Sequence, residues 1–194
     1  NSKDILDSNI IATLADCDSG LHIRGGRNSD AQFLCEKYAC MVEDIMELFR
    51  RKFPNDSLVI LSDHGMSNLT SPINIMSEIQ RRYSTKDILF FLDATMLRVW
   101  YLNPSKKGDF EKFVLSDKRI CKLSEKEREQ YRIVSREFGD DIFTIVSDEY
   151  MFAPSFYGRK MVRGMHGYLP KFESQYGICV TNDKNFILRV NKNK

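Results

Sequence analysis

The sequence predicts an α/β fold that carries a small inserted α+β lobe. Three observations lead to this prediction. A strand, a helix and a second strand follow one another within the first 61 residues, shorter strands and helices alternate from about residue 84 to 150, and strand patterns return near the end. Because strand–helix–strand units usually build a parallel sheet, we expect a sheet core formed by residues 1–83 and 151–194. Residues 84–150 then form the inserted lobe.

The first strand–helix–strand unit is predicted as follows. Residues 9–15, NIIATLA, have the pattern of a short buried strand, and the polar stretch DCDSGLHIRGGRN that follows cannot continue it. Ser29 with Gln32 three residues later is a capping-box signature, and apolar residues then recur at helical spacing as far as Phe49. This predicts a helix over residues 30–52. A Pro-Asn-Asp turn then leads into a strand over residues 57–61.

Shorter elements follow. From Pro72, the segment PINIMSEIQRRY predicts a second helix with proline near its first turn. ILFFLD and MLRVWYL predict two strands joined near Ala94, GDFEKFVLSD and SEKEREQYRI predict two helices, and DIFTIVS predicts another strand. YGICVTN and NFILRV predict two further strands near the end of the sequence.

Composition argues against several kinds of partner. The 194 residues have 42% hydrophobic content, which is enough to bury a core. The formal charge of +2 is too small to indicate a nucleic-acid polymer or an anionic membrane surface. No apolar run approaches the roughly 20 residues of a membrane helix, and no signal peptide is visible. The five cysteines contain no CxxC pair, which fits neither a disulfide framework nor a thiolate zinc site and favours a reducing compartment.

The histidines are few and share one kind of surrounding. The sequence has only three, His22, His64 and His166, and each lies in a polar segment that contains glycine. A single histidine is more often structural than functional. Two of these three, however, have a carboxylate close by in the sequence, which favours a joint role.

Their spacing favours a metal site. Asp18 and His22 are four residues apart, so one helical turn places both on the same side. Asp63 and His64 are adjacent at the carboxyl end of a predicted strand, where open α/β sheets place their ligand sites. Carboxylate and imidazole without thiolate suit a catalytic zinc, or another borderline divalent ion, held by three protein groups with one position open.

Taken together, DSGLHIRGG, ILSDHGM and GMHGY resemble, in this order, motifs of the type I phosphodiesterase and nucleotide pyrophosphatase family of the alkaline phosphatase superfamily. Within the lobe, FLDATMLRVWY and GDDIFTIVSDEYMFAPSFYG resemble segments of bacterial members, so the resemblance covers almost the whole chain. It implies an alkaline-phosphatase-like sheet with flanking helices, present here in part, and the inserted lobe.

The resemblance also implies two divalent metal ions, usually zinc, that bridge a phosphate. By motif match, Asp18, His22 and His166 hold one ion, and Asp63 and His64 belong to the other, so one site is complete and one is partial. In the family, the second ion also takes a strand-end aspartate and a Thr or Ser nucleophile from upstream sequence. No segment before Asp18 resembles that nucleophile turn. We therefore expect this chain to be the C-terminal part of a catalytic domain, inactive without its missing N-terminal part.

The implied function is hydrolysis of a small phosphoric ester, in which a hydroxyl attacks phosphorus between the two ions. The GMHGY ending favours the phosphodiesterase and nucleotide pyrophosphatase branch. A phosphotransferase or mutase of the same superfamily, and a metal-binding fragment without turnover, stay as alternatives. Nucleotide, lipid and phosphonate esters are all open as substrates. The compartment is open too, because family members also occur outside cells.

Two further segments have a functional and a structural interpretation. Asp93 to Met96 either positions the lobe over the site or simply joins two strands. Tyr168, close to His166, either lines a pocket or packs in the interior.

Overall fold

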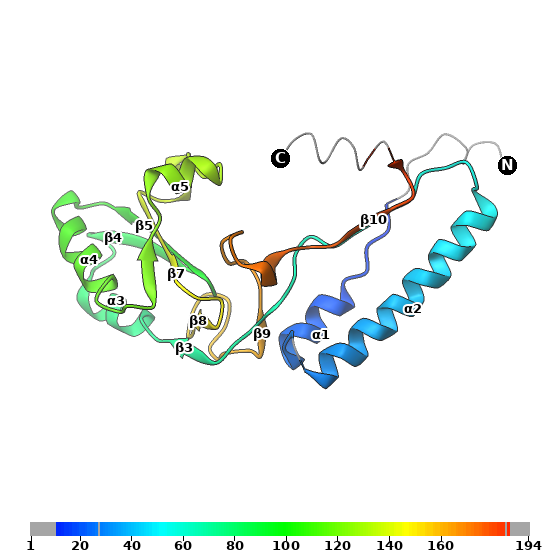
Figure 1. The fold of residues 1–194 in the computed structure, drawn as a ribbon. Coiled ribbons are helices and arrows are strands. Elements are labelled where there is room, and N and C mark those ends of the chain that lie inside the picture. The colour runs from blue at the N-terminus through cyan, green and yellow to red at the C-terminus, as the bar shows by residue number, and fades with distance from the viewer. Residues whose placement is uncertain (1–10, 27, 185, 187–194) are drawn as a thin grey trace.

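The structure, a computed structural model, describes residues 11–26, 28–184 and 186. In Figure 1 these residues form two parts that meet near the middle of the view. One part is an α+β body made by the middle of the chain. The other is elongated and combines the first two helices with a two-stranded ribbon.

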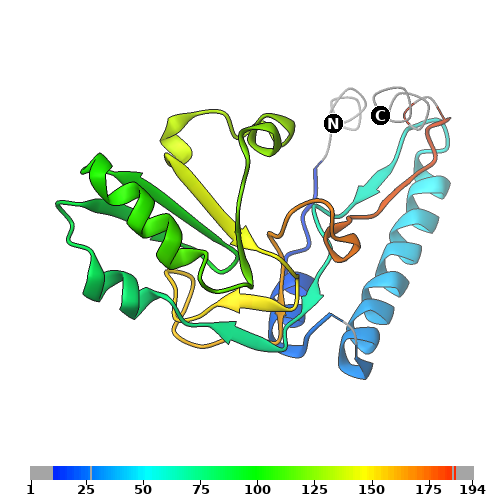
Figure 2. The same cartoon turned by 60° about the vertical axis from the view of Figure 1, so that its left-hand side comes forward.

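The α+β body is built on one antiparallel sheet. Its strand order is β4 (Ile88–Leu92), β5 (Met96–Tyr101), β7 (Asp141–Ile145) and β6 (Ile120–Lys122). The helices α3 (Met76–Arg82) and α4 (Lys107–Val114) lie beside this sheet (Figure 2). Their buried apolar side chains belong to the same core cluster as those of the sheet. A third helix, α5 (Glu125–Gln130), begins at a capping box formed by Ser124 and Glu127. The strands and helices predicted for the lobe are thus confirmed.

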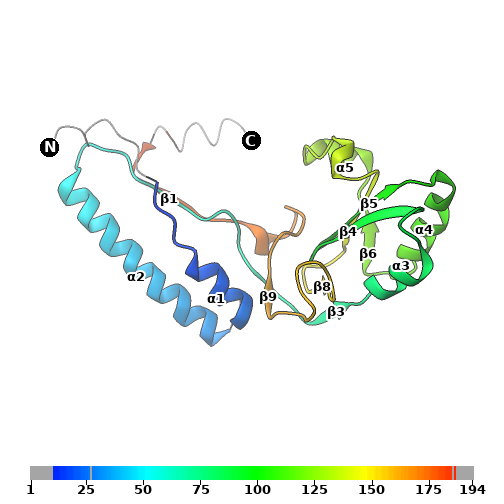
Figure 3. The same cartoon turned by 180° about the vertical axis from the view of Figure 1, so that it is seen from behind.

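Three short strand pairs connect the body to the elongated part. β3 (Ser71–Ile73) pairs parallel with β8 (Tyr150–Phe152). β2 (Ser67–Asn68) pairs antiparallel with β9 (Gly164–Met165), and β1 (Val59–Leu61) pairs antiparallel with β10 (Cys179–Thr181). Figure 3 shows β1 from behind, in the elongated part together with α2 (Ser29–Lys52). The chain therefore leaves and re-enters the body through adjacent segments. The described residues also include three 3-10 turns, η1 (Pro104–Lys106), η2 (Arg136–Phe138) and η3 (Glu173–Gln175).

The predicted long helix is confirmed as α2, but its cap is different. The side chain of Asn28, one residue before the expected cap, accepts a hydrogen bond from the Ala31 N–H at 2.9 Å. Before it, α1 (Asp16–Arg24) begins at two acidic residues and ends in His22 and Arg24, an order that suits the helix dipole.

The strand predicted over residues 9–15 is wrong for the part that the structure describes. Residues 11–15 have no regular structure and are exposed, and residues 9 and 10 lie outside the described residues. A strand needs a neighbour for its backbone groups, and within the described residues this segment has none. For the same reason the expected parallel pairing of the strand at 57–61 is wrong: its partner is the antiparallel β10.

The helix predicted from Pro72 is also partly wrong. Pro72 lies inside β3, and the helix begins only at Met76. Proline is tolerated there because, among the residues that the structure describes, β3 pairs with one strand and its other edge has no partner. The last predicted strand, NFILRV, lies almost wholly outside the described residues. None of the described helices is both long and apolar enough to cross a bilayer.

The buried core lies in the α+β body. Ile79, Leu97, Phe110 and Phe143 are its fully buried members from α3, β5, α4 and β7. By contrast, α2 buries only Ala31, and α1 buries none of its residues. The main core cluster runs from residue 73 to residue 168, so it includes side chains on both sides of the expected lobe boundaries. The division into domains at 84 and 150 stays a prediction.

Candidate metal centre

Helix α1 places the first two predicted ligands. The distance from His22 Nε2 to Asp18 Oδ1 is 3.5 Å, one helical turn apart, as the spacing predicts. The other ring nitrogen of His22, Nδ1, lies 2.8 Å from the carbonyl oxygen of Gly164 on β9. A carbonyl only accepts hydrogen bonds, so Nδ1 carries the proton. The lone pair of Nε2 is then left facing Asp18.

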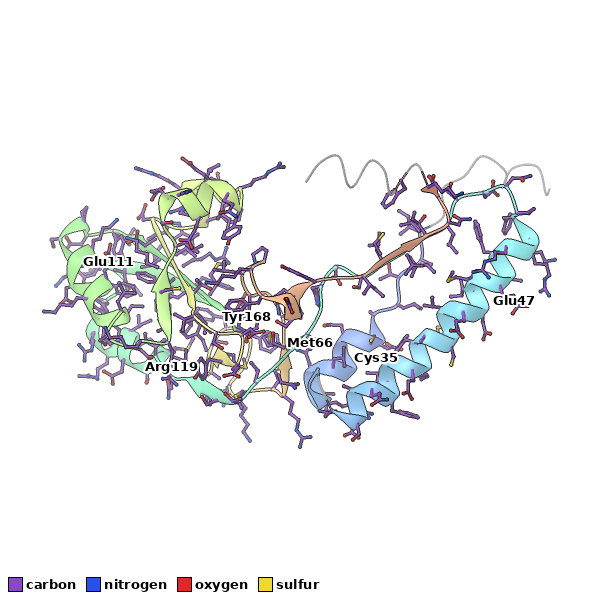
Figure 4. All side chains as sticks on the ribbon, in the orientation of Figure 1. Cys35, Glu47, Met66, Glu111, Arg119 and Tyr168 are labelled. Carbon is purple, nitrogen blue, oxygen red and sulfur yellow. The ribbon has the colours of Figure 1, made fainter. Side chains whose placement is uncertain are left out.

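The absence of a side chain at Gly164 explains why α1 can lie so close to β9. A Cβ atom added at Gly164 would lie 2.5 Å from the carbonyl oxygen of Leu21 and 3.0 Å from the side chain of Met66. The N–H of Arg163 also donates to the carbonyl of His22 at 3.0 Å. Figure 4 places Met66 at the junction of the two parts of the molecule. A glycine at 164 thus allows the backbone approach that fixes the His22 ring.

His166 follows β9 directly and completes the cluster. Its Nε2 lies 3.5 Å from Asp18 Oδ1, and ligand atoms of Asp18, His22 and His166 all lie within 4.8 Å of one another. Asp18 Oδ1 is buried and has no hydrogen-bond partner among the described residues. Such an oxygen between two imidazole nitrogens is costly unless something else binds it.

These residues fit a divalent metal ion. With zinc bonds of about 2.0 to 2.2 Å, two ligands of a tetrahedral ion lie roughly 3.3 to 3.6 Å apart, which includes the 3.5 Å separations at Asp18 Oδ1. One carboxylate and two imidazoles also form a donor set typical of catalytic zinc, with one position open to water or substrate. The geometry is therefore compatible with the predicted first site.

The other two predicted ligands lie next to this cluster. The His64 ring stacks on the His166 ring, with centroids 3.6 Å apart and planes 13° apart. His64 Nδ1 lies 2.8 Å from the Gly65 carbonyl oxygen, and its Nε2 lies 3.4 Å from Asp63 Oδ2. The side chain of Asp63 is 85% exposed. The structure thus brings all five predicted ligands together, with Asp63 at the open rim.

The protonation state of His166 suits a ligand. Burial lowers the pKa of His166, the neighbouring His64 lowers it further, and the nearby carboxylate of Asp18 only partly opposes these effects. The imidazole is therefore neutral near pH 7, which is the form that binds metal ions. Neutrality also removes charge repulsion from the stacked pair of rings.

A pocket of about 220 Å³ opens beside the cluster, with His166 in its wall. The turn between β4 and β5 lines it, so the DATM segment faces this pocket in addition to joining two strands. The full lining is Asp93, Ala94, Thr95, Met96, Arg98, Tyr157, Met165, His166 and Gly167. The Thr95 hydroxyl donates to the Gly167 carbonyl at 2.7 Å and so ties the turn to the segment that carries His166.

Sequence reasoning missed Tyr157. Its ring centroid lies 5.9 Å from that of His22. Burial and the carboxylates of Asp18 and Asp93 raise the pKa of the Tyr157 phenol, so it stays protonated at neutral pH. The available signal was its position in the Pro- and Gly-containing loop APSFYG, since aromatic residues exposed on such loops often contact ligands.

Tyr168 has the structural role. It is 7% exposed, and its hydroxyl donates to the Tyr150 carbonyl at 2.6 Å, which ties the segment after His166 to the α+β body.

Comparison with known proteins identifies the fold. No protein-family model and no curated protein matches this sequence. Among solved structures, murine ectonucleotide pyrophosphatase/phosphodiesterase 5 matches with a TM-score of 0.64 at 14% identity, over 84% of this chain and 44% of that one. Its inactive variant in complex with AMP matches with the same TM-score, identity and coverage. Phosphonoacetate hydrolase from Sinorhizobium meliloti 1021, in complex with phosphonoformate, matches with a TM-score of 0.60 at 13% identity, over 85% and 44%.

These likenesses confirm the predicted fold class. The chain has part of an alkaline-phosphatase-like α/β fold, with an α+β lobe packed beside the histidine cluster. It spans less than half the length of the solved structures that it matches.

Proposed function

We propose that this chain belongs to a metal-dependent hydrolase of phosphoric esters, of the phosphodiesterase and nucleotide pyrophosphatase type. The observation that carries the proposal is the buried Asp18 Oδ1, which has no hydrogen-bond partner in the part of the chain that the structure describes and lies 3.5 Å from both His22 Nε2 and His166 Nε2. The shared fold supports it, because the matching solved structures are a nucleotide pyrophosphatase/phosphodiesterase and a phosphonoacetate hydrolase.

In this proposal Asp18, His22 and His166 hold one divalent ion, and Asp63 and His64 contribute to a second. Zinc is the ion that the donor set favours. Bound ions of this kind stabilise negative charge on phosphoryl oxygens and lower the pKa of water. The chain's own groups have distinct tasks: the Gly164 carbonyl orients the His22 ring, and the protonated phenol of Tyr157 can donate a hydrogen bond to a phosphoryl oxygen.

We further propose that the working catalytic domain includes polypeptide beyond these residues, and that this polypeptide supplies the attacking hydroxyl. Two observations support this. The chain spans 44% of the length of the matching structures, and apolar side chains on α2, β1 and β10 are exposed, Leu61 at 64% among them. The added polypeptide would also complete the second ion site beside Asp63 and His64.

The test is an assay on bis(p-nitrophenyl) phosphate with the 194-residue chain and with a longer protein that includes the upstream sequence. We expect turnover only in the longer protein, and loss of that turnover with a chelator. In the longer protein, Asp18→Asn should reduce turnover about 100-fold or more, because it weakens the ligand that both imidazoles share. Asp16→Asn, on the same helix but exposed, is the matched control and should keep wild-type turnover.

The proposal fails if Asp18→Asn is as active as Asp16→Asn, or if chelation has no effect. Turnover by the 194-residue chain alone would overturn the assignment of the nucleophile to upstream polypeptide. If the longer protein binds zinc but does not turn over any ester, the alternative of a metal-binding domain without catalysis is favoured instead.

Phosphonate hydrolysis is a second candidate because one matching structure is a phosphonoacetate hydrolase. Release of inorganic phosphate from phosphonoacetate by the longer protein, measured beside the diester, decides between the two substrate classes. A transfer of the phosphoryl group to an added alcohol would indicate the phosphotransferase alternative.

A further inference from the structure

The pocket beside His166 carries two opposite charges that are not paired with each other. Asp93 and Arg98 both line it, and the contacts that each of them makes are with other groups. Within the described residues, Asp93 accepts one hydrogen bond, from the adjacent Ala94 N–H at 2.7 Å. The Arg98 guanidinium carbon lies 4.7 Å from the centroid of the Phe91 ring. Arg98 makes no ion pair with any residue that the structure describes.

The hairpin of β4 and β5 explains why both charges face the same space. Phe91 and Arg98 are directly opposite each other in the register, so their side chains lie on one face of the sheet. The backbone N–H of Asp93 donates a hydrogen bond to the Met96 carbonyl at 2.8 Å and closes the turn. The other face, which carries Leu92 and Leu97, is fully buried in the core. The hairpin therefore presents Arg98, among apolar neighbours such as Phe91, on the face that the core does not cover, and Arg98 and Asp93 both line the pocket.

The position of the pocket connects these charges with the proposed chemistry. His166 belongs both to the pocket wall and to the candidate metal cluster. A phosphoryl group held at the cluster would therefore extend its substituent into this pocket. The volume of about 220 Å³ is below the roughly 300 to 1,000 Å³ of sites for drug-sized ligands, so it suits a small substituent.

We propose that this pocket binds the organic group of the substrate, and that this group is a small zwitterion whose ammonium meets Asp93 and whose carboxylate meets Arg98. This inference rests on the proposed function, because it assumes that the phosphoryl group binds at the histidine cluster. A guanidinium can bind a carboxylate through two parallel hydrogen bonds, which makes Arg98 a selective partner. A substituent with only one charge leaves one of the two side chains unpaired, and this lowers its affinity.

The test measures binding to the zinc-loaded chain by calorimetry, without turnover. The probes are O-phosphoserine, phosphoethanolamine, phosphoglycolate and inorganic phosphate. They present both charges, the ammonium alone, the carboxylate alone and no substituent. We expect O-phosphoserine to bind about tenfold more tightly than each of the two singly charged esters.

Two variants separate the charges. Asp93→Asn keeps the oxygen that accepts from Ala94 and should weaken O-phosphoserine and phosphoethanolamine about tenfold, with phosphoglycolate unweakened. Arg98→Gln should weaken O-phosphoserine and phosphoglycolate about tenfold, with phosphoethanolamine unweakened. Binding of inorganic phosphate should stay the same in both variants, which shows that the cluster and the fold are intact.

The outcomes also distinguish this inference from the proposed function. If inorganic phosphate does not bind to the zinc-loaded wild type, this inference fails with its premise, whereas the proposed function is decided by the turnover assay on the longer protein. If it binds, but O-phosphoserine is no tighter than the singly charged esters, or the two variants weaken all ligands equally, the zwitterion assignment alone is overturned.

Discussion

Asp18 is the residue on which the candidate site depends. Its Oδ1 is buried without a hydrogen-bond partner in the described part of the chain, and leaving such an oxygen unpaired costs about 1 to 3 kcal/mol. His22 Nε2 and His166 Nε2 each lie 3.5 Å from it, a spacing at which all three atoms can bind one ion. A divalent ion bound to Asp18 Oδ1 would remove this cost.

The first prediction follows from this contact. Zinc should stabilise the wild-type chain against urea, by about 2.7 kcal/mol when free zinc is at 100 times its dissociation constant. Asp18→Asn should lose most of this zinc-dependent gain, because an amide oxygen is a much weaker ligand than a carboxylate. The measurement is the urea midpoint with zinc and with a chelator.

Asp16→Asn is the control, since it removes an exposed carboxylate from the first turn of the same helix. It should keep the full zinc-dependent gain. Equal gains in both variants would mean that zinc binds elsewhere on the chain and that Asp18 is not a ligand.

At the residue scale, the sequence could predict neighbours but not distant partners. The spacing of Asp18 and His22 predicts their contact through helix geometry alone. The approach of His166, 148 residues after Asp18, follows from no local pattern, and only the resemblance between motifs suggested it. Tyr157 was missed because a loop aromatic has no periodicity to mark it. The assignment of Asp18, His22, His166, Asp63 and His64 as ligands stays a prediction.

At the scale of elements, the packing of α1 on β9 decides whether the cluster forms. Gly164 lies at their contact: its carbonyl oxygen orients the His22 ring, and its missing side chain leaves room for the Leu21 carbonyl. Any side chain there must push the helix away from the strand.

The second prediction tests this contact. Gly164→Ala should destabilise the chain by about 1 to 3 kcal/mol, because the added Cβ would meet backbone at 2.5 Å, and backbone cannot rotate away. It should also weaken zinc binding, since the helix that carries Asp18 and His22 must shift. Urea unfolding and zinc titration measure the two effects.

Gly108→Ala provides the matched control. Gly108 lies in α4, and a Cβ added there would meet nothing within 4 Å. This change should raise stability by up to about 1 kcal/mol, because alanine favours a helix over glycine, and it should leave zinc affinity unchanged. If Gly164→Ala behaves like Gly108→Ala, the close packing of α1 on β9 is not what orients His22.

Element predictions succeeded where local patterns decide and failed where pairing decides. The long helix α2 follows from helical periodicity and the strands β4, β5 and β7 from short β-branched and apolar runs, and the structure confirms them. The segment 9–15 has a strand-like composition, but its described residues 11–15 form no strand, because a strand depends on a neighbour. The helix predicted from Pro72 begins only at Met76, because Pro72 lies in β3, whose second edge has no partner strand among the described residues and so tolerates proline.

At the scale of the whole molecule, burial is uneven. The core cluster lies in the α+β body, while the run Leu58 to Leu61 has apolar residues on both faces of a two-stranded ribbon. Ile60 faces α2, because it lines a cavity of about 210 Å³ together with Phe49. Leu61 must then lie on the opposite face, and it is 64% exposed. A strand that is apolar on both faces is typical of a sheet covered on both sides.

The third prediction uses this asymmetry. In the 194-residue chain, Leu61→Lys should change the free energy of unfolding by less than about 0.5 kcal/mol, because the side chain is largely exposed. In a longer protein that includes the upstream sequence, the same change should destabilise by about 2 kcal/mol or more, because the added polypeptide covers this face of the ribbon. Urea unfolding of both proteins, each with and without the change, measures the difference.

Leu102→Lys separates this effect from a general response to lysine. Leu102 is 54% exposed, but it follows β5 in the α+β body, away from the β1–β10 ribbon. It should have the same small effect in both proteins. If Leu61→Lys is equally mild in the longer protein, the apolar face of the ribbon is not covered by the same polypeptide. The proposal that upstream sequence completes both the sheet and the second ion site would then lose its structural support, whereas the cluster of Asp18, His22 and His166, which lies on α1 and beside β9, would be unaffected.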